Sequence, residues 1–465
     1  MSSRPGPRRS LPLVTAPLAT VPLAAVALAA AVALAAWAGA TGYRGMVRVG
    51  WSRSFEDLTI YRDAALAAWS AHDVYDLRLS WAHLPFTYPP FAILVLGWTA
   101  LLTERAAQLT MLALNAALLL AGCLLSCRSA AGGGRSRTWI VTGGFVAAAV
   151  GCCLDPVLAT MGFGQVNLLV MVAVLADCLL VPPRWRGLLT GAATSVKLTP
   201  GIFLLYFLCT GQRRAAYRQV VGVLATSLLA ALVLPASSRT YWTGVVTTNR
   251  AGRTTYASNQ SWSGLVDRLV HDRGVALTAT LVLDAVTVVV AALAIRGCTR
   301  RNAPLSAVCA TALTGLLVSP ISWSHHWVWV VPLLVALAVE RPFRGSFPAA
   351  VGLVAVFRAP PLWRVPQGFP SELHWDLRQT LLGDRFCLAA AAVLVATALG
   401  TRRGRGSALD VHSQPAPASS PGPRRPPARE RRGPSSGVLD PGRSRVTISG
   451  RSAPNRGSLR RWRCP

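Results

Sequence analysis

The sequence predicts an all-α polytopic membrane protein. Hydrophobic residues make up 52% of the 465-residue chain, charged residues only 14%, and the mean hydropathy is +0.42. Apolar stretches of about 17–25 residues, long enough to cross a bilayer, recur between short loops that carry arginine. A soluble chain of this length would instead form two or three domains with alternating polar faces. We therefore expect one membrane domain over residues 11–401, with roughly 10–13 membrane segments.

The arginines indicate how the chain crosses the membrane. Residues 11–40 form an apolar run behind the basic stretch 4-RPGPRRS-10, and this run is too long for the core of a signal peptide. We expect it to be a retained first helix, with residues 1–10 in the cytoplasm. By the positive-inside rule, cytoplasmic loops are predicted at 128–137, 184–186, 213–218, 296–301, 341–344 and from 402 onward. The segments predicted to face outside are 41–84, 155–167, 237–264, 319–327 and 359–379.

Two segments disturb this simple topology. Residues 84–127 look like two spans around Glu104 and Arg105, which would return Arg128 to the outside, so either one segment is re-entrant or one loop breaks the rule. Residues 184–214 are basic at both ends, so both ends are predicted to lie in the cytoplasm. Only about 25 residues lie between those ends, fewer than two complete spans need. A pair of half-helices broken at 197-KLTP-200 fits better than one crossing, because proline cannot continue the backbone ladder.

Lys197 lies in this break and is the only lysine in the chain. A cation in an apolar environment is costly, which predicts a role such as pairing with a phosphate or a carboxylate. The alternative is a lysine that extends its ammonium group to the membrane interface from an ordinary span.

The first outer loop, residues 41–84, carries the most informative polar pattern. Apolar residues recur there at helical spacing, which predicts an amphipathic helix near the membrane surface: Leu58, Tyr61, Leu66 and Trp69. Asp57 and Tyr61 are four residues apart and share a face. A carboxylate held between lipid and water can have a raised pKa and accept a proton from a sugar or alcohol. The prolines of 85-PFTYPPF-91 then turn the chain and hold Tyr88 at the membrane edge. Alternatively, Asp57 and Asp63 are solvated and Tyr88 only anchors the chain.

The net charge of +29 could indicate a nucleic-acid partner, but the position of the charge argues against one. Much of the excess lies in loops and in the tail 402–465, which is rich in Pro, Ser, Gly and Arg. We expect this tail to be disordered, cytoplasmic and able to touch anionic lipid headgroups. The ten cysteines lack metal-ligand spacing, and several lie in apolar runs. We expect no metal cluster, no disulfide framework and no cofactor.

A series of motifs resembles glycosyltransferase family 87. The motifs, which follow the order of the family, are 57-DLTIY-61, 73-DVYDL-77, 86-FTYPPF-91, 164-GQVN-167, 197-KLTP-200, 258-SNQSWSGL-265 and 319-SPISWSHHWVW-329. That family comprises actinobacterial polyprenol-phosphate-mannose-dependent α-(1→2)-mannosyltransferases. The resemblance covers roughly residues 55–331, and no single motif would be sufficient for it.

The resemblance implies a GT-C fold and a polyprenyl-phosphate mannose donor, with a mannoside or glycolipid as the acceptor. It also implies that the active site faces outward and that Asp57 is the general base, with Asp63 as the nearest rival. Lys197, with Arg62 or Arg253, would steady the departing phosphate. The other side chains expected to bind donor phosphate or sugar are Tyr61, Tyr88, Gln165, Asn167, Asn259, Gln260, His325 and His326, although Asn259 and Gln260 could equally cap a loop and the histidines could belong to an interfacial belt.

Other functions remain open at this level. Lipid-linked arabinose is an alternative donor, because related GT-C enzymes use it through a similar architecture. A transporter or flippase of glycolipids would also have broken helices and an intramembrane lysine. Against a transporter, the two halves of the chain show no internal repeat, and the polar motifs gather on the outer side instead of the midplane. A site-free assembly protein fits the motif series least.

Overall fold

The structure is a computed structural model that describes residues 55–403, apart from 71, 81–82, 249 and 359–363. Regular structure in this part of the chain is helical, and strand pairing is limited to two isolated bridges, Leu79 with Leu84 and Asn259 with Trp323. The described residues all belong to the first of two units, Met1–His412 and Ser413–Pro465. The predicted first helix at 11–40, the N-terminal residues 1–10 and the tail beyond 403 lie outside the described residues.

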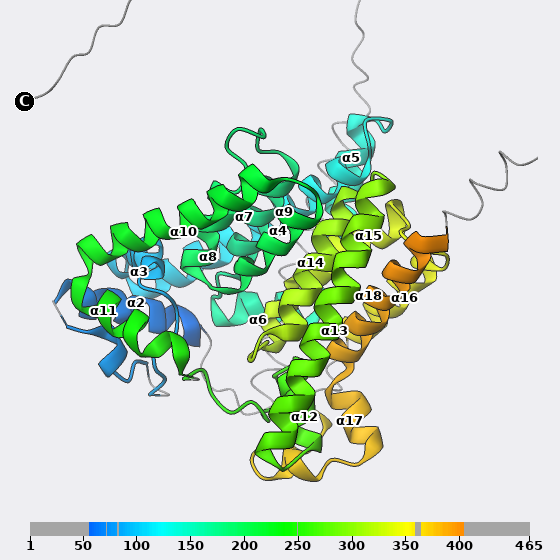
Figure 1. Cartoon of the computed structure of the whole chain (residues 1–465). Coiled ribbons are helices and arrows are strands. Elements are labelled where there is room, and N and C mark those ends of the chain that lie inside the picture. Colours follow the sequence, from blue (N-terminus) through cyan, green and yellow to red (C-terminus); the bar gives the residue numbers. More distant parts are fainter. Residues whose placement is uncertain (1–54, 71, 81–82, 249, 359–363, 404–465) are drawn as a thin grey trace, which may run out of the picture. The chain divides into compact units, whose positions relative to one another are not determined.

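The chain begins with short elements and continues into longer helices (Figure 1). The first elements are α2 (Glu56–Trp69), η1 (Val74–Asp76), α3 (Phe91–Leu96) and η2 (Gly97–Leu101). The middle of the chain forms α4 (Glu104–Ala130), α5 (Arg137–Gly151), α6 (Asp155–Phe163), α7 (Asn167–Leu179), α8 (Leu188–Val196), η3 (Thr199–Ile202), α9 (Phe203–Cys209), α10 (Arg213–Val233), α11 (Pro235–Thr243) and η4 (Val245–Thr247). The last part forms α12 (Trp262–Leu269), α13 (Arg273–Arg300), α14 (Pro304–Val318), η5 (Ser324–Trp329), α15 (Val330–Val339), α16 (Ser346–Arg358), η7 (Ser371–His374), α17 (Leu377–Gly383) and α18 (Arg385–Arg403).

Three of the described helices, α4, α10 and α13, are each long and apolar enough to cross a membrane. Two bent pairs, α5 with α6 (77°) and α17 with α18 (72°), raise the number to five if each pair is one span. Six shorter apolar helices of 10–17 residues accompany them in the described part of the chain. The predicted all-α, polytopic class is confirmed, whereas the expected count of membrane segments is reached only if the shorter helices are included.

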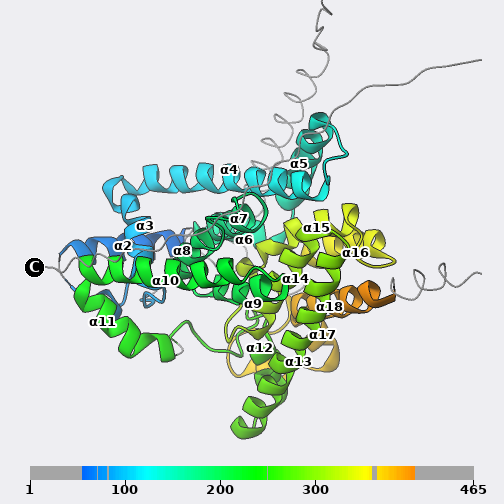
Figure 2. The ribbon, with the colours of Figure 1, turned by 45° about the horizontal axis from the view of Figure 1, so that its top comes forward.

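The long helices start where side chains satisfy the first free backbone N–H groups. Thr103 caps α4 by accepting from the backbone N–H of Ala106, and Asp272 caps α13 by accepting from that of Val275. Both helices then run through apolar sequence, and in α4 the buried side chains include Met111 and Leu119. Figure 2 shows α4 extended beside α5 and α7, against which it packs.

The first irregular segment, residues 84–127, contains one long helix and one short one. The apolar helix Phe91–Leu101, formed by α3 and η2, is shorter than the ~17 residues that a crossing needs, whereas α4 is long enough alone. A single crossing by α4 removes the conflict that two spans created in the predicted topology. The second irregular segment, 184–214, is confirmed as two helices, α8 and α9 with η3, separated by a break at Lys197 and Leu198.

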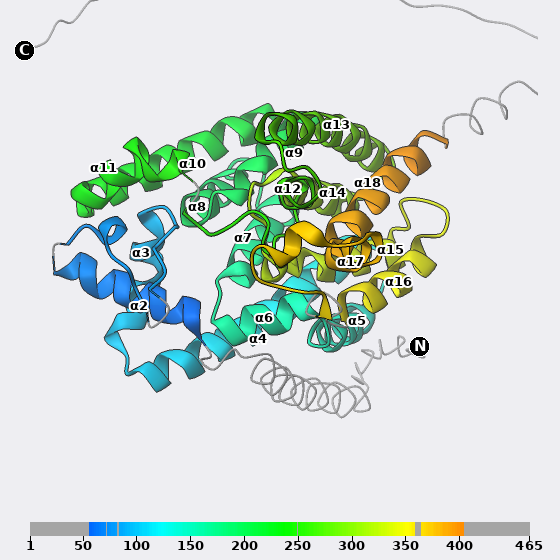
Figure 3. The same cartoon turned by 90° about the horizontal axis from the view of Figure 1, so that it is seen from below.

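The helix predicted in the first outer loop is α2, and it joins the rest of the protein through one face. Leu58 and Tyr61 are each 1% exposed, while Leu66 and Trp69 are 45% and 53% exposed. The predicted apolar stripe is therefore divided, with its first half packed against protein. Figure 3 shows α6 and α7 between the α2–α3 pair on one side and α14, α15 and α18 on the other. Because η5 packs on both α6 and α7, the motif at 319–329 lies close to the motif at 164–167, which joins those two helices.

Candidate active site

A hydrogen-bonded group of two tyrosines and a glutamine lies where α2 meets the loop between α6 and α7. The hydroxyls of Tyr61 and Tyr88 each lie 2.9 Å from Oε1 of Gln165 and 3.1 Å from one another. Their rings meet edge to face, with centroids 5.4 Å apart. Tyr75 fixes the second tyrosine by donating from its hydroxyl to the backbone oxygen of Tyr88 at 2.6 Å. Three residues that the sequence proposed from separate motifs are thus in direct contact.

Asp57 lies one turn before Tyr61 on α2 and joins this group. Its side chain is half-buried and hydrogen-bonds with the Gln165 side chain. Burial raises the pKa of Asp57 from its ordinary value of 3.8 to about 6, and the charge of Glu56 adds to the rise. The hydrogen bond from Gln165 and the positive charge of Lys197 oppose it. A carboxyl with this pKa is ionised at neutral pH and remains basic enough to take a proton from a hydroxyl.

Lys197 extends from the break between α8 and η3 to a polar network on its other side. Its Nζ donates to Oδ1 of Asn167 at 2.7 Å and lies 5.3 Å from the ring centre of Tyr88. Asn167 in turn donates from Nδ2 to the backbone oxygen of His325 at 2.8 Å. Thr160 donates to that same oxygen at 2.9 Å. The predicted intramembrane cation is therefore held by the first residue of α7 and connected to η5.

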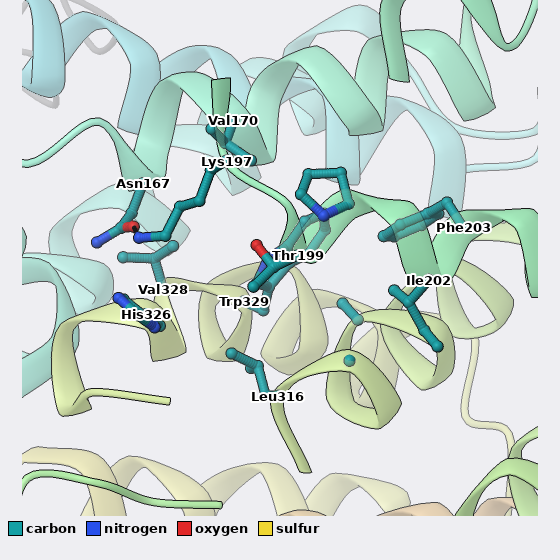
Figure 4. Close-up of a pocket in the computed structure, with 13 residues that line it drawn as sticks. Asn167, Val170, Lys197, Thr199, Ile202, Phe203, Leu316, His326, Val328 and Trp329 are labelled. Carbon is teal, nitrogen blue, oxygen red and sulfur yellow. Dashed lines mark hydrogen bonds between the residues drawn. The ribbon is translucent and has the colours of Figure 1, made fainter. Parts of the chain in front are cut away.

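A small cavity opens beside this lysine (Figure 4). Asn167, Lys197 and His326 form its polar end. Most of the remaining lining is apolar and comes from α7, η3, α9, α14 and η5, including Val170, Ile202, Phe203, Leu316, Val328 and Trp329. A space with a cation at one end and hydrocarbon along its walls matches an amphiphile with an anionic head.

The two adjacent histidines have different surroundings. His326 lines the cavity and is partly exposed, whereas His325 is 8% exposed and packs its ring against Phe163, with centroids 5.4 Å apart. The two imidazole rings meet edge to face at 4.7 Å. Nε2 of His325 and Nδ1 of His326 are buried and have no hydrogen-bond partner among the described residues. Of the pair, His326 is the one placed to meet a ligand in the cavity.

Three other predicted residues lie outside this cluster. The carboxylate of Asp63 accepts from the backbone N–H of Ser80 at 3.0 Å. Arg62 donates to the backbone oxygens of Thr99 and Leu102, so it ties α2 to η2. Arg253 places its guanidinium 4.2 Å from the ring centre of Phe369. None of these interactions directs the side chain to Asp57 or to the cavity.

Asn259 and Gln260 are also not brought into the cluster, and their geometry favours the loop-capping alternative. Both side chains are 0% exposed. Asn259 donates to the backbone oxygens of Thr254 and Pro320 and accepts from the backbone N–H of Ser322. Gln260 donates to Ala257 and Gly383 and accepts from Phe386. A buried ion pair between Arg268 and Asp384 supports the same region, so these amides hold the loop that leads to η5.

Some residues of the cluster could not be singled out from motifs. Thr160 helps to hold His325, and Asn115 of α4 donates to the backbone oxygen of Gln165 at 3.1 Å. Asn115 is 1% exposed in an otherwise apolar helix. A buried amide in such a run is itself a signal of a functional neighbourhood, because polar groups inside membranes are costly. Among the described residues, no group of three or more His, Cys, Asp and Glu is arranged to hold a metal ion.

The fold and the site together define a helical membrane protein in which a half-buried carboxylate, Asp57, and a buried lysine, Lys197, lie near a small cavity. The sequence profile of glycosyltransferase family 87 matches residues 86–320. The chain belongs to this family and is a membrane glycosyltransferase. This agrees with the predicted family and enzyme class.

Curated relatives support the same assignment. A polyprenol-phosphate-mannose-dependent alpha-(1-2)-phosphatidylinositol pentamannoside mannosyltransferase of Mycobacterium tuberculosis (strain CDC 1551 / Oshkosh) is 36% identical over 63% of this chain and 69% of the relative. A polyprenol-phosphate-mannose-dependent alpha-(1-2)-phosphatidylinositol mannoside mannosyltransferase of Mycolicibacterium smegmatis is 35% identical over 68% of this chain and 76% of the relative. No solved structure matches the chain.

Proposed function

We propose that this protein transfers mannose from polyprenyl-phosphate mannose to a cell-envelope mannoside or glycolipid, with inversion, and forms an α-(1→2) linkage. The observation that carries the proposal is the half-buried Asp57 facing Lys197, because the reaction needs a base for the acceptor and a cation for the leaving phosphate. The donor and the linkage are those that the names of the relatives state. The cavity beside Lys197 has the apolar walls that the first part of an isoprenoid chain requires.

The proposed reaction is a single in-line displacement. The acceptor hydroxyl oxygen forms a bond to C1 of mannose while the bond from C1 to the phosphate oxygen breaks. The electron pair of the broken bond leaves with polyprenyl phosphate, and the hydroxyl proton passes to the Asp57 carboxylate. A phosphate is already an adequate leaving group, so the reaction requires charge stabilisation but no general acid.

Lys197 and His326 would receive the phosphate at the polar end of the cavity. The ammonium group of Lys197 supplies a positive charge, and its hydrogen bond to Asn167 leaves two of its three N–H donors for phosphate oxygens. The imidazole of His326 lies in the same lining and can add a further hydrogen bond. We propose that this arrangement neutralises the phosphate without a divalent metal. Chelation of divalent ions with EDTA is then expected to leave the initial rate unchanged.

We also propose that the site faces the extracytoplasmic side and that the C-terminal tail lies in the cytoplasm. The distribution of arginines supports this orientation, because the basic loops and the tail collect on one predicted side and the site motifs on the other. A lipid-linked donor fits this orientation. Cysteines introduced singly at exposed positions, with labelling by a membrane-impermeant maleimide in intact cells, would test it.

Donor choice tests the function directly. Membranes that contain the protein would receive radiolabelled polyprenyl-phosphate mannose, polyprenyl-phosphate arabinose or GDP-mannose, each with the same mannoside acceptor. The proposal predicts labelled product from the first donor, and release of the label by an α-(1→2)-specific mannosidase. Product from the arabinose donor alone would replace mannose with a pentose. Transport of a labelled glycolipid without any transfer would favour the flippase alternative.

A further inference from the structure

The loop 164-GQVN-167 occupies the junction between the base and the cation. Gly164 ends α6 with a left-handed backbone (φ 68°), and an added Cβ would lie 2.7 Å from Cβ of Leu58 on α2. The loop therefore presses on the helix that carries Asp57 as closely as a glycine permits. The backbone N–H of Gln165 bonds to the oxygen of Thr160 at 2.9 Å, which closes the turn. The closed turn therefore fixes the backbone positions from which the side chains of Gln165 and Asn167 extend.

The amide of Gln165 has one orientation that satisfies its neighbours. The hydroxyl oxygen of Tyr61 accepts a hydrogen bond from the backbone N–H of Val166, so its own proton is available for Oε1 of Gln165. The Tyr88 hydroxyl donates to the same oxygen. With Oε1 held by two hydroxyl donors, Nε2 is the atom that remains for the carboxylate of Asp57. Gln165 thereby holds the Asp57 carboxylate through its amide nitrogen.

The amide of Asn167 is fixed by a similar argument. The backbone oxygen of His325 can only accept, so the atom of Asn167 that faces it at 2.8 Å is Nδ2. The same Nδ2 lies 3.2 Å from Oγ1 of Thr160. Oδ1 must then face Lys197, whose Nζ lies 2.7 Å away. This geometry uses both N–H groups of the Asn167 amide and one of the two acceptor positions of Oδ1 within the protein, so no amide donor is left for a ligand.

We infer that Gln165 and Asn167 are positioning residues, the first for the base Asp57 and the second for the phosphate-binding cation Lys197, and that neither binds sugar. The inference rests on the proposed function for the roles of Asp57 and Lys197. It departs from the expectation that these amides contact the donor. Because two residues of one short loop set both charged groups, the loop fixes the base and the cation relative to each other.

The first test is the pH dependence of kcat/KM in Gln165→Leu and Gln165→Glu. The titratable groups that face Asp57 are Glu56 and Tyr61 on its own helix, Tyr88 before α3, and Lys197. Leucine cannot donate to Asp57, and an ionised glutamate can only accept and adds a like charge. The acid limb of the kcat/KM profile is therefore expected to move up by about one to two pH units in both variants. At pH 7 this leaves about 2- to 10-fold less of the ionised base. Gln165→Glu keeps oxygen acceptors for the hydroxyls of Tyr61 and Tyr88, so it still tests the inference if Gln165→Leu fails to fold.

The matched control is Gln219→Leu. Gln219 is a buried glutamine, 3% exposed, which donates to the backbone oxygen of Pro200 at 3.1 Å. Removal of the Gln219 amide would disturb packing but is expected to leave the acid limb of the kcat/KM profile at its wild-type pH. An unmoved limb in both Gln165 variants, with transfer still measurable, would overturn the inference for Gln165.

A spectroscopic titration separates this inference from the proposed function. The carboxyl band of Asp57, isolated as the infrared difference between wild type and Asp57→Asn, reports protonation without any sugar transfer. The band is expected to titrate about one to two pH units higher in Gln165→Leu than in the parent. If the parent transfers no mannose and the band still shifts, the proposed function fails while the positioning role stands. An unshifted band refutes the positioning role.

The second test concerns Asn167→Leu, which removes the partner of the Lys197 ammonium. We expect KM for polyprenyl-phosphate mannose to rise about tenfold while KM for the acceptor changes little, because one positioned charged hydrogen bond is lost. Asn115→Leu is the matched control, since Asn115 is a buried amide that contacts the same loop only through a backbone oxygen. Equal changes in both KM values, or the same donor effect in Asn115→Leu, would reduce Asn167 to a general structural role.

Discussion

Replacement of Asp57 by asparagine is expected to stabilise the folded protein while it slows transfer strongly. In the folded state, burial raises the pKa of the Asp57 carboxyl from 3.8 to about 6. The folded state therefore binds this proton more tightly than the unfolded chain does. As pH rises through this interval, the unfolded chain loses the proton first and folding stability falls. Above about pH 6, the ionised carboxylate is a destabilising group that asparagine removes.

The size of the effect follows from the shift. A change of about two pKa units corresponds to about 3 kcal/mol at neutral pH. The Asp57 side chain is only half-buried, so solvent screening reduces this value, and a gain of about 1–2 kcal/mol is the expectation. With the entropy of unfolding typical of a chain of this size, about 1 kcal/mol per kelvin, that gain corresponds to a rise in Tm of about 1–2 °C. The difference should vanish below pH 4, where both states of the wild type are protonated.

The assay is thermal unfolding of purified wild type and Asp57→Asn in one detergent at pH 4, 5, 6, 7 and 8. The Tm of the variant minus that of the wild type is predicted to increase as pH rises from 4 to 7 and to stay constant above pH 7. Asp63→Asn serves as the control, because the Asp63 carboxylate accepts a backbone hydrogen bond that asparagine keeps only in part. A variant whose advantage is independent of pH, or that is less stable than wild type at pH 8, would refute the reasoning.

Four further outcomes are expected. The kcat/KM of wild type should fall about tenfold per pH unit below about pH 6, as Asp57 takes up its proton, in a rate profile from pH 4.5 to 8. Lys197→Met should lower kcat/KM by about 10²-fold or more, and arginine should restore little, in transfer assays at saturating acceptor. Gly164→Ala should cost about 1–3 kcal/mol in unfolding experiments, while Gly352→Ala, inside α16 where a Cβ meets open space, should be neutral or stabilise by up to about 1 kcal/mol. Arg268→Met should destabilise by about 3–5 kcal/mol because it leaves its partner carboxylate buried without a cation, and a fall in Tm checks this.

Much of the architecture could be predicted from the sequence because it depends on patterns within one segment. Apolar length predicts the membrane helices, and Asp57 and Tyr61 share a face of α2 because helical spacing requires it. The break at Lys197 follows from the proline and the single lysine. The helix Phe91–Leu101 ends just before Thr103 and Glu104, where α4 starts, so its length is set by the apolar run itself and is too short for a crossing.

The orientation of side chains in the site depends on segments far apart in the chain, and here sequence reasoning was insufficient. Asn259 and Gln260 stand in a motif of polar residues, yet their partners are backbone groups near Pro320 and Gly383. Gln165 and Asn167 contact Tyr61, Tyr88, Lys197 and the backbone of His325, a set drawn from four separate regions. Which atom of an amide meets which partner is decided by that set, and no local spacing encodes it.

The central claim is that Asp57 is the base in transfer of mannose from a lipid phosphate. Its most direct test measures transfer from radiolabelled polyprenyl-phosphate mannose to a mannoside acceptor in membranes with wild type, Asp57→Asn or Asp63→Asn, alongside donor binding by photo-crosslinking. We predict that Asp57→Asn binds the donor but transfers about 10²- to 10⁴-fold more slowly, whereas Asp63→Asn keeps most of the activity. Transfer at the wild-type rate by Asp57→Asn, or loss of transfer only in Asp63→Asn, would contradict the assignment.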